Sequence, residues 1–430
     1  MLSSRHRLPS AIFLAGRRRY RCAPYSTATD TRDLLNSLSL QPPRPLNLRT
    51  LLSFGDPLTP SSVLSSVQYV LDEVPRRLAT RIRMLEALPF IVCSNPHISS
   101  TLHAHRDSLH KLVSVQKPTT MQENQHFAGV LEDLVARHAD DVPTMAKGFQ
   151  ECSRYISSQD MTDFLDRAIR NRISVRLIAE QHCAISLMLN QPEGRDISIV
   201  DMHCSPQMMV EKAGHFVGQL CESTLGATPG IVIDGHTDAT FATVPIHLEY
   251  ILTEVLKNSF RATVEHHHRT HRSQSDRTPI PPVQVTLCSP SPLNPAQQSH
   301  PRFFSIRVRD QGGGVSPENM ARIFSYAFTT TAKGLDGDDD NIGGPYAAQH
   351  IGGMAAVDSD AGGGDLFGEI TSKGLQTGLG TLSGLGYGLP MSKLYASFFG
   401  GSLELFTLEG WGSDVLIKMR CLEEMGDAVI

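Results

Sequence analysis

The chain has 430 residues, of which 40% are hydrophobic and 19% charged, and its formal net charge is −5. This composition is typical of a globular protein that is long enough for two or three domains. The negative charge gives no indication of a nucleic-acid partner. No apolar run approaches the roughly 20 residues of a membrane-spanning helix, and the eight cysteines form no CxxC pair that would indicate a zinc site or a disulfide framework.

The first 28 residues differ from the rest of the chain. They are rich in serine and alanine, the first acidic residue is Asp30, and the segment contains six arginines: Arg5, Arg7, Arg17, Arg18, Arg19 and Arg21. An arginine-rich, serine-rich segment without acids is typical of a mitochondrial transit peptide, and the alternative is a disordered basic tail. We therefore expect residues 1–28 to be a transit peptide and the mature protein to lie in the mitochondrial matrix.

From Leu34 to Ser205 the apolar pattern is helical throughout. A candidate N-cap, Thr59, precedes the first long amphipathic run. Further helices are expected over 74–88, 98–115, 127–138 (continuing to residue 155 across Pro143) and 160–190. Long helices joined by short turns favour an up-and-down bundle, so residues 34–205 are predicted to form a four-helix-type bundle domain.

After Ser205 the pattern becomes mixed, which predicts a second domain over 206–430 and an α+β fold for the whole chain. Helices are expected over 206–225, 247–265 and 391–399, and strands over 231–235, 239–244, 283–288, 303–309, 402–408 and 413–420. The stretch from His266 to Pro282 is polar and broken by proline, so we expect a surface loop. Its four histidines fix no metal geometry. Residues 334–384 are rich in Gly, Asp and Ser, which favours a long functional or disordered loop.

The helix expected over 247–265 contains the first candidate site. Its apolar residues recur at steps of three and four, which stacks Glu254 over Asn258 on one face. A carboxylate can accept a proton, and an amide oxygen suits a Mg²⁺ ion that takes its other ligands from water and phosphate. The alternative is that both residues form the solvated edge of a core helix.

Two glycine motifs follow this helix. Asp310-Gln311-Gly312-Gly313-Gly314 comes directly after an expected strand, where glycines let the backbone approach a ligand. The motif Gly384-Leu385-Gly386-Tyr387-Gly388 opens a helix, and free N–H groups at a helix start favour phosphate. Each motif is weak alone. Their order along the chain is much more specific: a polar helix, a strand followed by DxGxG, a long loop, and GxGxG followed by a helix.

This order resembles the ATP-binding fold of gyrase B, MutL and the sensor histidine kinases, an α/β sandwich in which the long loop forms a lid, here about 328–384. Within that superfamily the chain is most similar to the mitochondrial 2-oxoacid dehydrogenase kinases. The segments that carry the similarity are 254–265, DQGGGV (310–315), YAFTTT (326–331), GLGYGLP (384–390) and 400–415, together with LPFIVCSNP (88–96) and RLIAEQH (176–182) in the helical half.

The resemblance implies a role for each matching residue. Glu254 would be the general base for a substrate serine, Asn258 the Mg²⁺ ligand, and Asp310 the acceptor of the adenine amine. The remaining ATP-binding candidates are backbone and lid positions and one arginine: Arg261, Gly312, Gly314, Thr329, Thr330, Gly384, Leu385, Gly386 and Gly388. A surface ion pair with Glu265 is an equally good interpretation of Arg261.

The resemblance also implies cofactors and partners. ATP and Mg²⁺ are expected, with K⁺ as a further candidate. The substrate would be the decarboxylase component of a 2-oxoacid dehydrogenase complex, which phosphorylation would inactivate, and docking would use the lipoyl-bearing core. A homodimer is expected, with no nucleic acid and no membrane span.

Two other functions stay open. One is a non-catalytic, nucleotide-gated regulator of the same complex, against which the intact Glu254 and Asn258 argue. The other is a histidine autokinase or ATPase, although no H-E-x-R-T motif is present and His182 is more simply explained as a packed helix residue.

Two features favour the branched-chain complex over the pyruvate complex as the target. Tyr250 stands where pyruvate dehydrogenase kinases typically carry histidine, and a tyrosine there is expected to alter the hydrogen bonding and pKa of Glu254. The chain also ends soon after its last strand, without an Asp-Trp pair. A pyruvate dehydrogenase (acetyl-transferring) kinase is the alternative.

Overall fold

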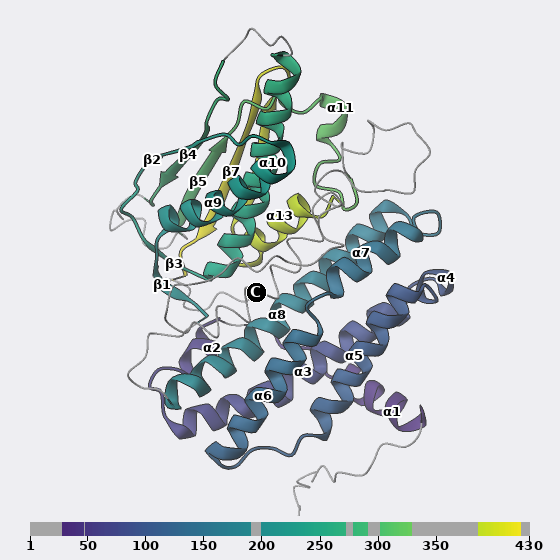
Figure 1. Cartoon of the computed structure of the whole chain (residues 1–430). Coiled ribbons are helices and arrows are strands. Elements are labelled where there is room, and N and C mark those ends of the chain that lie inside the picture. The colour runs from purple at the N-terminus through teal and green to yellow at the C-terminus, as the bar shows by residue number, and fades with distance from the viewer. Residues whose placement is uncertain are drawn as a thin grey trace, which may run out of the picture.

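The structure is a computed structural model, and it describes residues 28–46, 48–190, 199–271, 278–290, 302–328 and 386–422. The chain forms two parts that lie against each other, a helical part that comes first and a mixed α/β part that follows (Figure 1). This arrangement confirms the predicted fold class. Among the described residues, no helix is both long enough and apolar enough to cross a membrane.

The helical part consists of long helices packed side by side (Figure 1). The long ones are α3 (Pro60–Glu86), α5 (Pro96–Ser114), α6 (Met121–Arg137) and α8 (Ser158–Asn190). The shorter ones are α1 (Ala28–Ser39), α2 (Leu48–Ser53), α4 (Phe90–Cys93) and α7 (Asp141–Glu151). Helix α8 contacts α2, α3 and α6 within the bundle and also α13 of the second part, so it connects the two halves of the molecule.

Helix α3 begins at the predicted cap. The Thr59 hydroxyl accepts the Ser62 N–H at 3.1 Å and the Ser62 hydroxyl accepts the Thr59 N–H at 3.0 Å, which satisfies both amides in a capping box. Further along, the fully buried Glu73 forms ion pairs with Arg76 and Arg77 on the same helix and with Arg44 of the preceding segment. These pairs fix the segment before α2 against the bundle.

Two boundary predictions in the bundle were wrong. The structure has one continuous helix from Pro60 to Glu86 with Pro75 inside it, where a separate helix was expected to start at Val74. The helix expected to run to Tyr155 instead ends at Arg137, and α7 begins at Asp141. Pro143 thus falls in the first turn of α7, where a missing N–H costs nothing.

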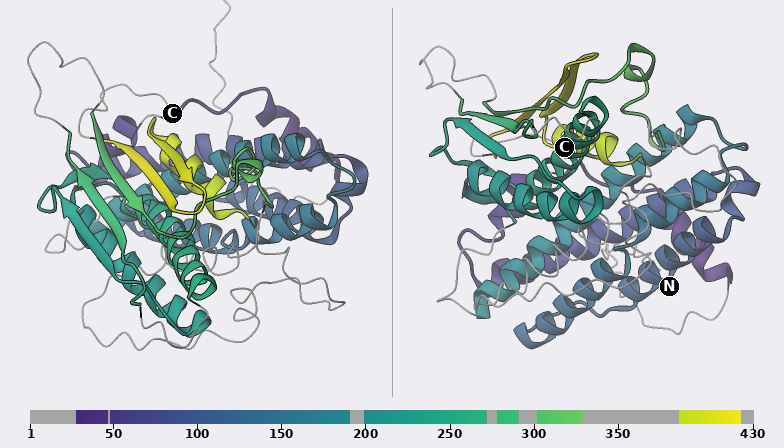
Figure 2. Two further views of the ribbon diagram at one scale, coloured as in Figure 1. Left: turned by 90° about the horizontal axis from the view of Figure 1, so that it is seen from above. Right: turned by 45° about the horizontal axis from the view of Figure 1, so that its top comes forward.

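The α/β part is built on a five-stranded sheet in the order β2-β4-β5-β7-β6 (Figure 2). Its strands are β2 (Ile231–Gly235), β4 (Val283–Cys288), β5 (Phe303–Arg309), β6 (Ser402–Leu408) and β7 (Gly412–Arg420). Only the β2–β4 pair is parallel. Alternate residues of β4 and β5 are buried, so one face of the sheet packs against helices.

Three helices cover that face: α9 (Pro206–Leu225), α10 (Pro245–Thr270) and α13 (Gly388–Phe398). Helix α10 contacts both of the others and strands β4 and β5. A short helix, α11 (Pro317–Met320), follows β5. The expected boundaries of α9, β2, β4, β5 and β6 are confirmed to the residue.

Two predictions in this part needed correction. Strand β1 (Asp201–Cys204) pairs antiparallel with β3 (Phe241–Thr243), although the stretch before Ser205 was expected to be helical. The strand therefore hydrogen-bonds with the second part, and the division at Ser205 stays a prediction. The polar stretch from His266 was expected to be a loop, yet α10 continues to Thr270.

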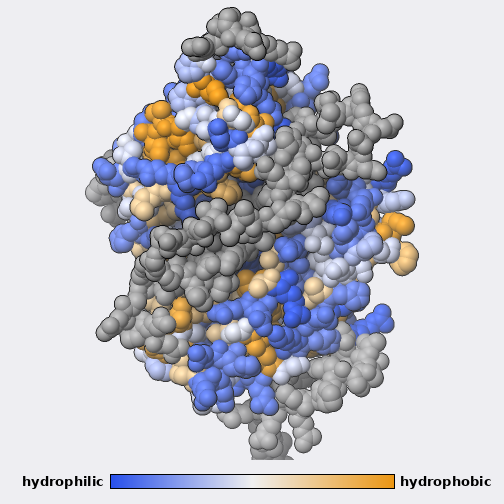
Figure 3. Space-filling view, viewed as in Figure 1, coloured by the Kyte–Doolittle hydropathy of each residue, from blue (hydrophilic) through white to orange (hydrophobic). Residues whose placement is uncertain are grey.

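Among the described residues seen in Figure 3, most of the surface is hydrophilic, and the apolar residues form scattered patches. Exposed apolar side chains of the described residues include Phe90 in α4, Met208 in α9, and Phe406, Leu408 and Trp411 in the β6–β7 hairpin.

Candidate active site

Helix α10 places Glu254 inside the protein. Its carboxylate is on the helix face that packs toward α13, and only 3% of the residue is exposed. Asn258, one turn later, is exposed. Burial thus contradicts the interpretation of Glu254 as part of a solvated helix edge, whereas the exposure of Asn258 fits both that interpretation and a ligand position. A buried carboxylate needs a partner, and the structure supplies one.

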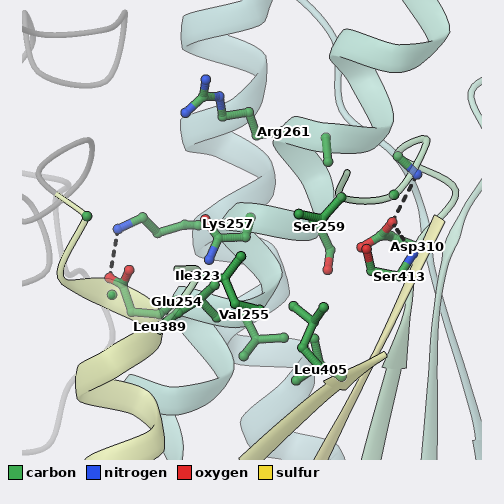
Figure 4. A pocket seen from close by; sticks show the side chains of 18 of the residues that line it. Glu254, Val255, Lys257, Ser259, Arg261, Asp310, Ile323, Leu389, Leu405 and Ser413 are labelled. Carbon is green, nitrogen blue, oxygen red and sulfur yellow. Dashed lines mark hydrogen bonds and ion pairs between the residues drawn. The ribbon is translucent and has the colours of Figure 1, made fainter. Parts of the chain in front are cut away.

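That partner is Lys257, whose ammonium donates to Glu254 Oε1 at 2.8 Å (Figure 4). Lys257 is itself only 6% exposed. Opposite charges three residues apart on a helix can form an ion pair in this way. Inside the protein, each charge offsets part of the desolvation cost of the other. The ion pair thus holds the carboxylate in a single position at the edge of the pocket.

Asp310 lies on the opposite side of the same pocket (Figure 4). Its Oδ1 accepts the backbone N–H groups of Gly312 at 2.9 Å and Ser413 at 3.0 Å. Burial raises the pKa of Asp310, while those two N–H groups and Ser259 act in the other direction. The carboxylate is therefore fixed by β7 and by the glycine turn after β5.

The second glycine motif lies against Glu254 and against the segment before residue 329. A Cβ on Gly388 would overlap the Glu254 carboxylate, and a Cβ on Gly386 would overlap the backbone of Phe328. Gly386 also has a φ of 74°, in the left-handed region that favours glycine. No side chain fits at either position, so the backbone itself forms this wall of the pocket.

The pocket has a volume of about 350 Å³, within the usual range for small-molecule sites. It brings together eight of the predicted site residues: Glu254, Asn258, Arg261, Asp310, Gly312, Gly314, Gly386 and Gly388. The other four, Thr329, Thr330, Gly384 and Leu385, and almost all of the expected lid over 328–384, lie outside the described residues.

Several pocket residues were not predicted from the sequence. Ser413 of β7 and Phe328 line the pocket with Leu389 and Leu405. All four lie in segments that carry the family resemblance, but which residues of those segments line the pocket depends on how strands and loops far apart in the chain are brought together. Arg261 does line the pocket, and its Nε donates to Glu265 Oε1 at 2.7 Å, which is the ion pair considered as its alternative.

Tyr250 does not hold Glu254 directly. Its hydroxyl donates to the sulfur of Met391 at 3.5 Å, and the carboxylate of Glu254 accepts from Lys257. Burial, and after it the nearby charge of Glu254, raise the pKa of Tyr250 well above its usual value. The hydroxyl therefore stays protonated, and the hydrogen bonding of Glu254 is set by Lys257.

His182 is a packed residue of α8, as the sequence indicated. It is fully buried, its Nδ1 lies 3.1 Å from the Ser66 hydroxyl, and its ring contacts Phe127. Burial lowers its pKa to about 4. An imidazole enclosed in this way cannot reach a nucleotide in the pocket.

The donor set of the pocket fits a magnesium nucleotide. The backbone cradle around Gly386 and Gly388 excludes side chains, and backbone N–H groups at the start of a helix favour phosphate. The exposed amide of Asn258 offers an oxygen of the kind that Mg²⁺ binds. Asp310 offers a fixed carboxylate to an amine.

The sequence is similar to those of known proteins over most of its length. Residues 45–221 match the family model described as "Mitochondrial branched-chain alpha-ketoacid dehydrogenase kinase". A mitochondrial [pyruvate dehydrogenase (acetyl-transferring)] kinase of Arabidopsis thaliana is 27% identical over 386 residues, which cover 89% of this chain and 91% of the relative. The corresponding kinase 1 of Saccharomyces cerevisiae is 26% identical, with 92% and 89% covered, and isozyme 4 of Rattus norvegicus is 27% identical, with 88% and 82% covered.

Fold, pocket and relatives together define the class: the protein is an ATP-binding protein kinase, a transferase. More narrowly, the chain matches the mitochondrial 2-oxoacid dehydrogenase kinase family, over residues 45–221 in the family model and over 88–92% of its length in the relatives. It is accordingly mitochondrial, and the family implies ATP and Mg²⁺ as cofactors.

Proposed function

We propose that the chain transfers the γ-phosphoryl group of ATP to a serine of the decarboxylase component of the pyruvate dehydrogenase complex, in the mitochondrial matrix. The observation that carries the proposal is the joint placement of Glu254, Asn258 and Asp310 around one pocket. The three relatives described above are all named for the pyruvate enzyme and cover most of both chains. They favour the pyruvate complex over the branched-chain complex that the sequence features had favoured.

In this proposal Glu254 accepts the proton of the substrate hydroxyl as the oxygen attacks phosphorus. Lys257 holds the carboxylate before the substrate arrives, so little reorganisation is needed. Bound Mg²⁺ would neutralise phosphate charge, and Asn258 would hold it. The glycine cradle fixes the phosphates, and Asp310 fixes the base of the nucleotide. Phosphoryl transfer depends mainly on such positioning and charge neutralisation.

The branched-chain complex is the second candidate. The name of the matching family model favours it. Tyr250, one turn before Glu254, was the sequence feature in its favour, but its hydroxyl contacts Met391 and not Glu254. The lipoyl-bearing core would raise the local concentration of either substrate, as tethering does. The proposal also includes K⁺ as a further cofactor and a homodimer as the oligomeric state.

The deciding experiment compares initial rates of phosphate transfer to both reconstituted complexes at equal core concentration, with the modified serine mapped by mass spectrometry. The proposal expects faster transfer to the pyruvate decarboxylase component. Faster transfer to the branched-chain component would make the second candidate the answer. Nucleotide binding without transfer to either would favour the non-catalytic regulator.

A further inference from the structure

Residues 322–328 form a short connection between the helical bundle and the wall of the nucleotide pocket. Phe328 lines the pocket next to Gly386. Two residues earlier, Tyr326 is 4% exposed, and its hydroxyl donates to Asp166 Oδ1 of α8 at 2.7 Å. A hydrogen bond between residues 160 positions apart thus joins α8 to the segment that leads into the pocket.

The backbone between these two residues is strained. Ala327 has a φ of 61°, in the left-handed region that non-glycine residues rarely adopt. Among the described residues it is the only non-glycine residue with a positive φ. Such a conformation persists where the residues on both sides are held. Here Tyr326 is held by Asp166, and Phe328 lies against the Gly386 backbone, with the Arg322 guanidinium 4.6 Å from the centre of its ring.

Tyr326 also touches the glycine motif itself. Its ring lies 5.3 Å from the ring of Tyr387, at 54°. Tyr387 is 1% exposed and directly precedes Gly388, whose Cα lies against the Glu254 carboxylate. A second link runs from α8 to α13, because Arg170 donates to the Ser397 hydroxyl at 3.2 Å. Asp166 and Arg170, one turn apart on α8, thus contact Tyr326 beside the glycine motif and Ser397 near the end of α13.

We propose that Tyr326 is a positioning residue for the nucleotide: through its hydrogen bond to Asp166, helix α8 of the bundle holds Phe328, Gly386 and Gly388 in the geometry that binds the phosphates. This inference rests on the proposed function, since it assigns the pocket to ATP. A change in the position of α8 then changes the affinity for ATP without any contact between α8 and the nucleotide. The Tyr326 ring transmits the position of the helix, and the hydroxyl fixes the ring.

The test compares Mg-ATP dissociation constants of full-length variants by nucleotide titration. Tyr326→Phe removes only the hydroxyl, and Asp166→Ala removes its acceptor. Each should raise the dissociation constant of Mg-ATP by about threefold to tenfold. This is the effect expected when a hydrogen bond to a charged group is lost and only part of its free energy contributes to ATP binding. The double variant should be no weaker than either single one, because both remove the same contact.

Two further variants separate positioning from general stability. Asp166→Asn keeps an oxygen that can accept the tyrosine hydroxyl, so its affinity for ATP should stay within about twofold of the unmodified protein. Tyr155→Phe is the matched control, because Tyr155 is a bundle tyrosine that is 57% exposed. It should change neither ATP binding nor the thermal midpoint.

Unchanged ATP affinity in both Tyr326→Phe and Asp166→Ala would overturn the inference, whatever their thermal midpoints. Additive losses in the double variant, or an Asp166→Asn variant as weak as Asp166→Ala, would also overturn it. The unmodified protein is measured first. If it binds Mg-ATP but phosphorylates neither complex, the proposed function fails and the inference is still tested; if it binds no Mg-ATP, both fail.

Discussion

The sharpest test of the site is Glu254→Gln. Glutamine keeps the volume of the side chain and an oxygen that can accept from Lys257, which lies 2.8 Å from Glu254 Oε1, but it cannot take a proton. General-base catalysis is worth roughly 10² to 10⁴ in rate, which corresponds to about 3 to 5 kcal/mol of activation free energy. We expect the turnover of serine phosphorylation to fall by that factor.

ATP binding should be nearly unchanged in Glu254→Gln. The carboxylate that would bind the adenine of ATP belongs to Asp310, which lies on the opposite side of the pocket from Glu254 (Figure 4). Titration with Mg-ATP and single-turnover phosphorylation of the decarboxylase component therefore separate binding from chemistry.

Glu249→Gln is the matched control. Glu249 is on the same helix, and its ion pair with Lys212 at 3.0 Å is partly exposed, so the change should alter stability by less than about 1 kcal/mol and leave turnover intact. Near-normal turnover in Glu254→Gln would refute its assignment as the base. A loss of ATP binding equal to the loss of turnover would show instead that the substitution damages the pocket.

Three further predictions concern single residues. Asp310→Asn keeps an acceptor for the neighbouring backbone N–H groups but loses the charge, so ATP binding should weaken about tenfold or more; an unchanged titration would exclude the adenine assignment. Gly388→Ala should displace the Glu254 carboxylate and lower turnover, while Gly129→Ala, where an added methyl meets no atom within 4 Å, should not. Burial lowers the pKa of His182 to about 4, so the unfolded chain binds its proton first and the free energy of unfolding should fall by about 3 kcal/mol from this group between pH 6.5 and 4. Denaturant titrations across that range should show a shallower pH dependence for His182→Gln, and an equal slope would contradict the prediction.

Periodicity was a reliable guide wherever one face of an element is buried. The strands β4 and β5 alternate strictly between buried and partly exposed residues, and their boundaries were predicted to the residue. Strand β1 has only one buried residue, Cys204, among four, so no alternation marks it. The strand is recognisable only from its pairing with β3, which the local sequence does not reveal.

Helix ends were predicted less well because polar residues can continue a helix that is anchored elsewhere. Helix α10 is buried along its first five turns, and its last turn carries His267, His268 and Arg269. Basic residues favour the C-terminal end of a helix, so this turn persists where composition alone indicated a loop. In α3 the packing on both sides of Pro75 outweighs the hydrogen bond that proline removes.

The candidate site was predictable as a set of motifs but not as a geometry. Glu254, Asp310 and the glycines were found because each lies in a local pattern. The buried ion pair with Lys257 required the fold, since the same sequence spacing on a solvated face would give a weak surface pair. The hydrogen bond of Tyr326 to Asp166 spans 160 positions, and no local pattern could indicate it.

The choice of target complex is the point where sequence and structure diverge most. Tyr250 favoured the branched-chain complex on the assumption that residue 250 sets the state of the base. In the structure Lys257 contacts Glu254, and the Tyr250 hydroxyl contacts the sulfur of Met391, a weak acceptor. A residue that is 1% exposed and faces α13 cannot meet a protein substrate. The identity of residue 250 is therefore a poor guide to the choice between the two decarboxylases.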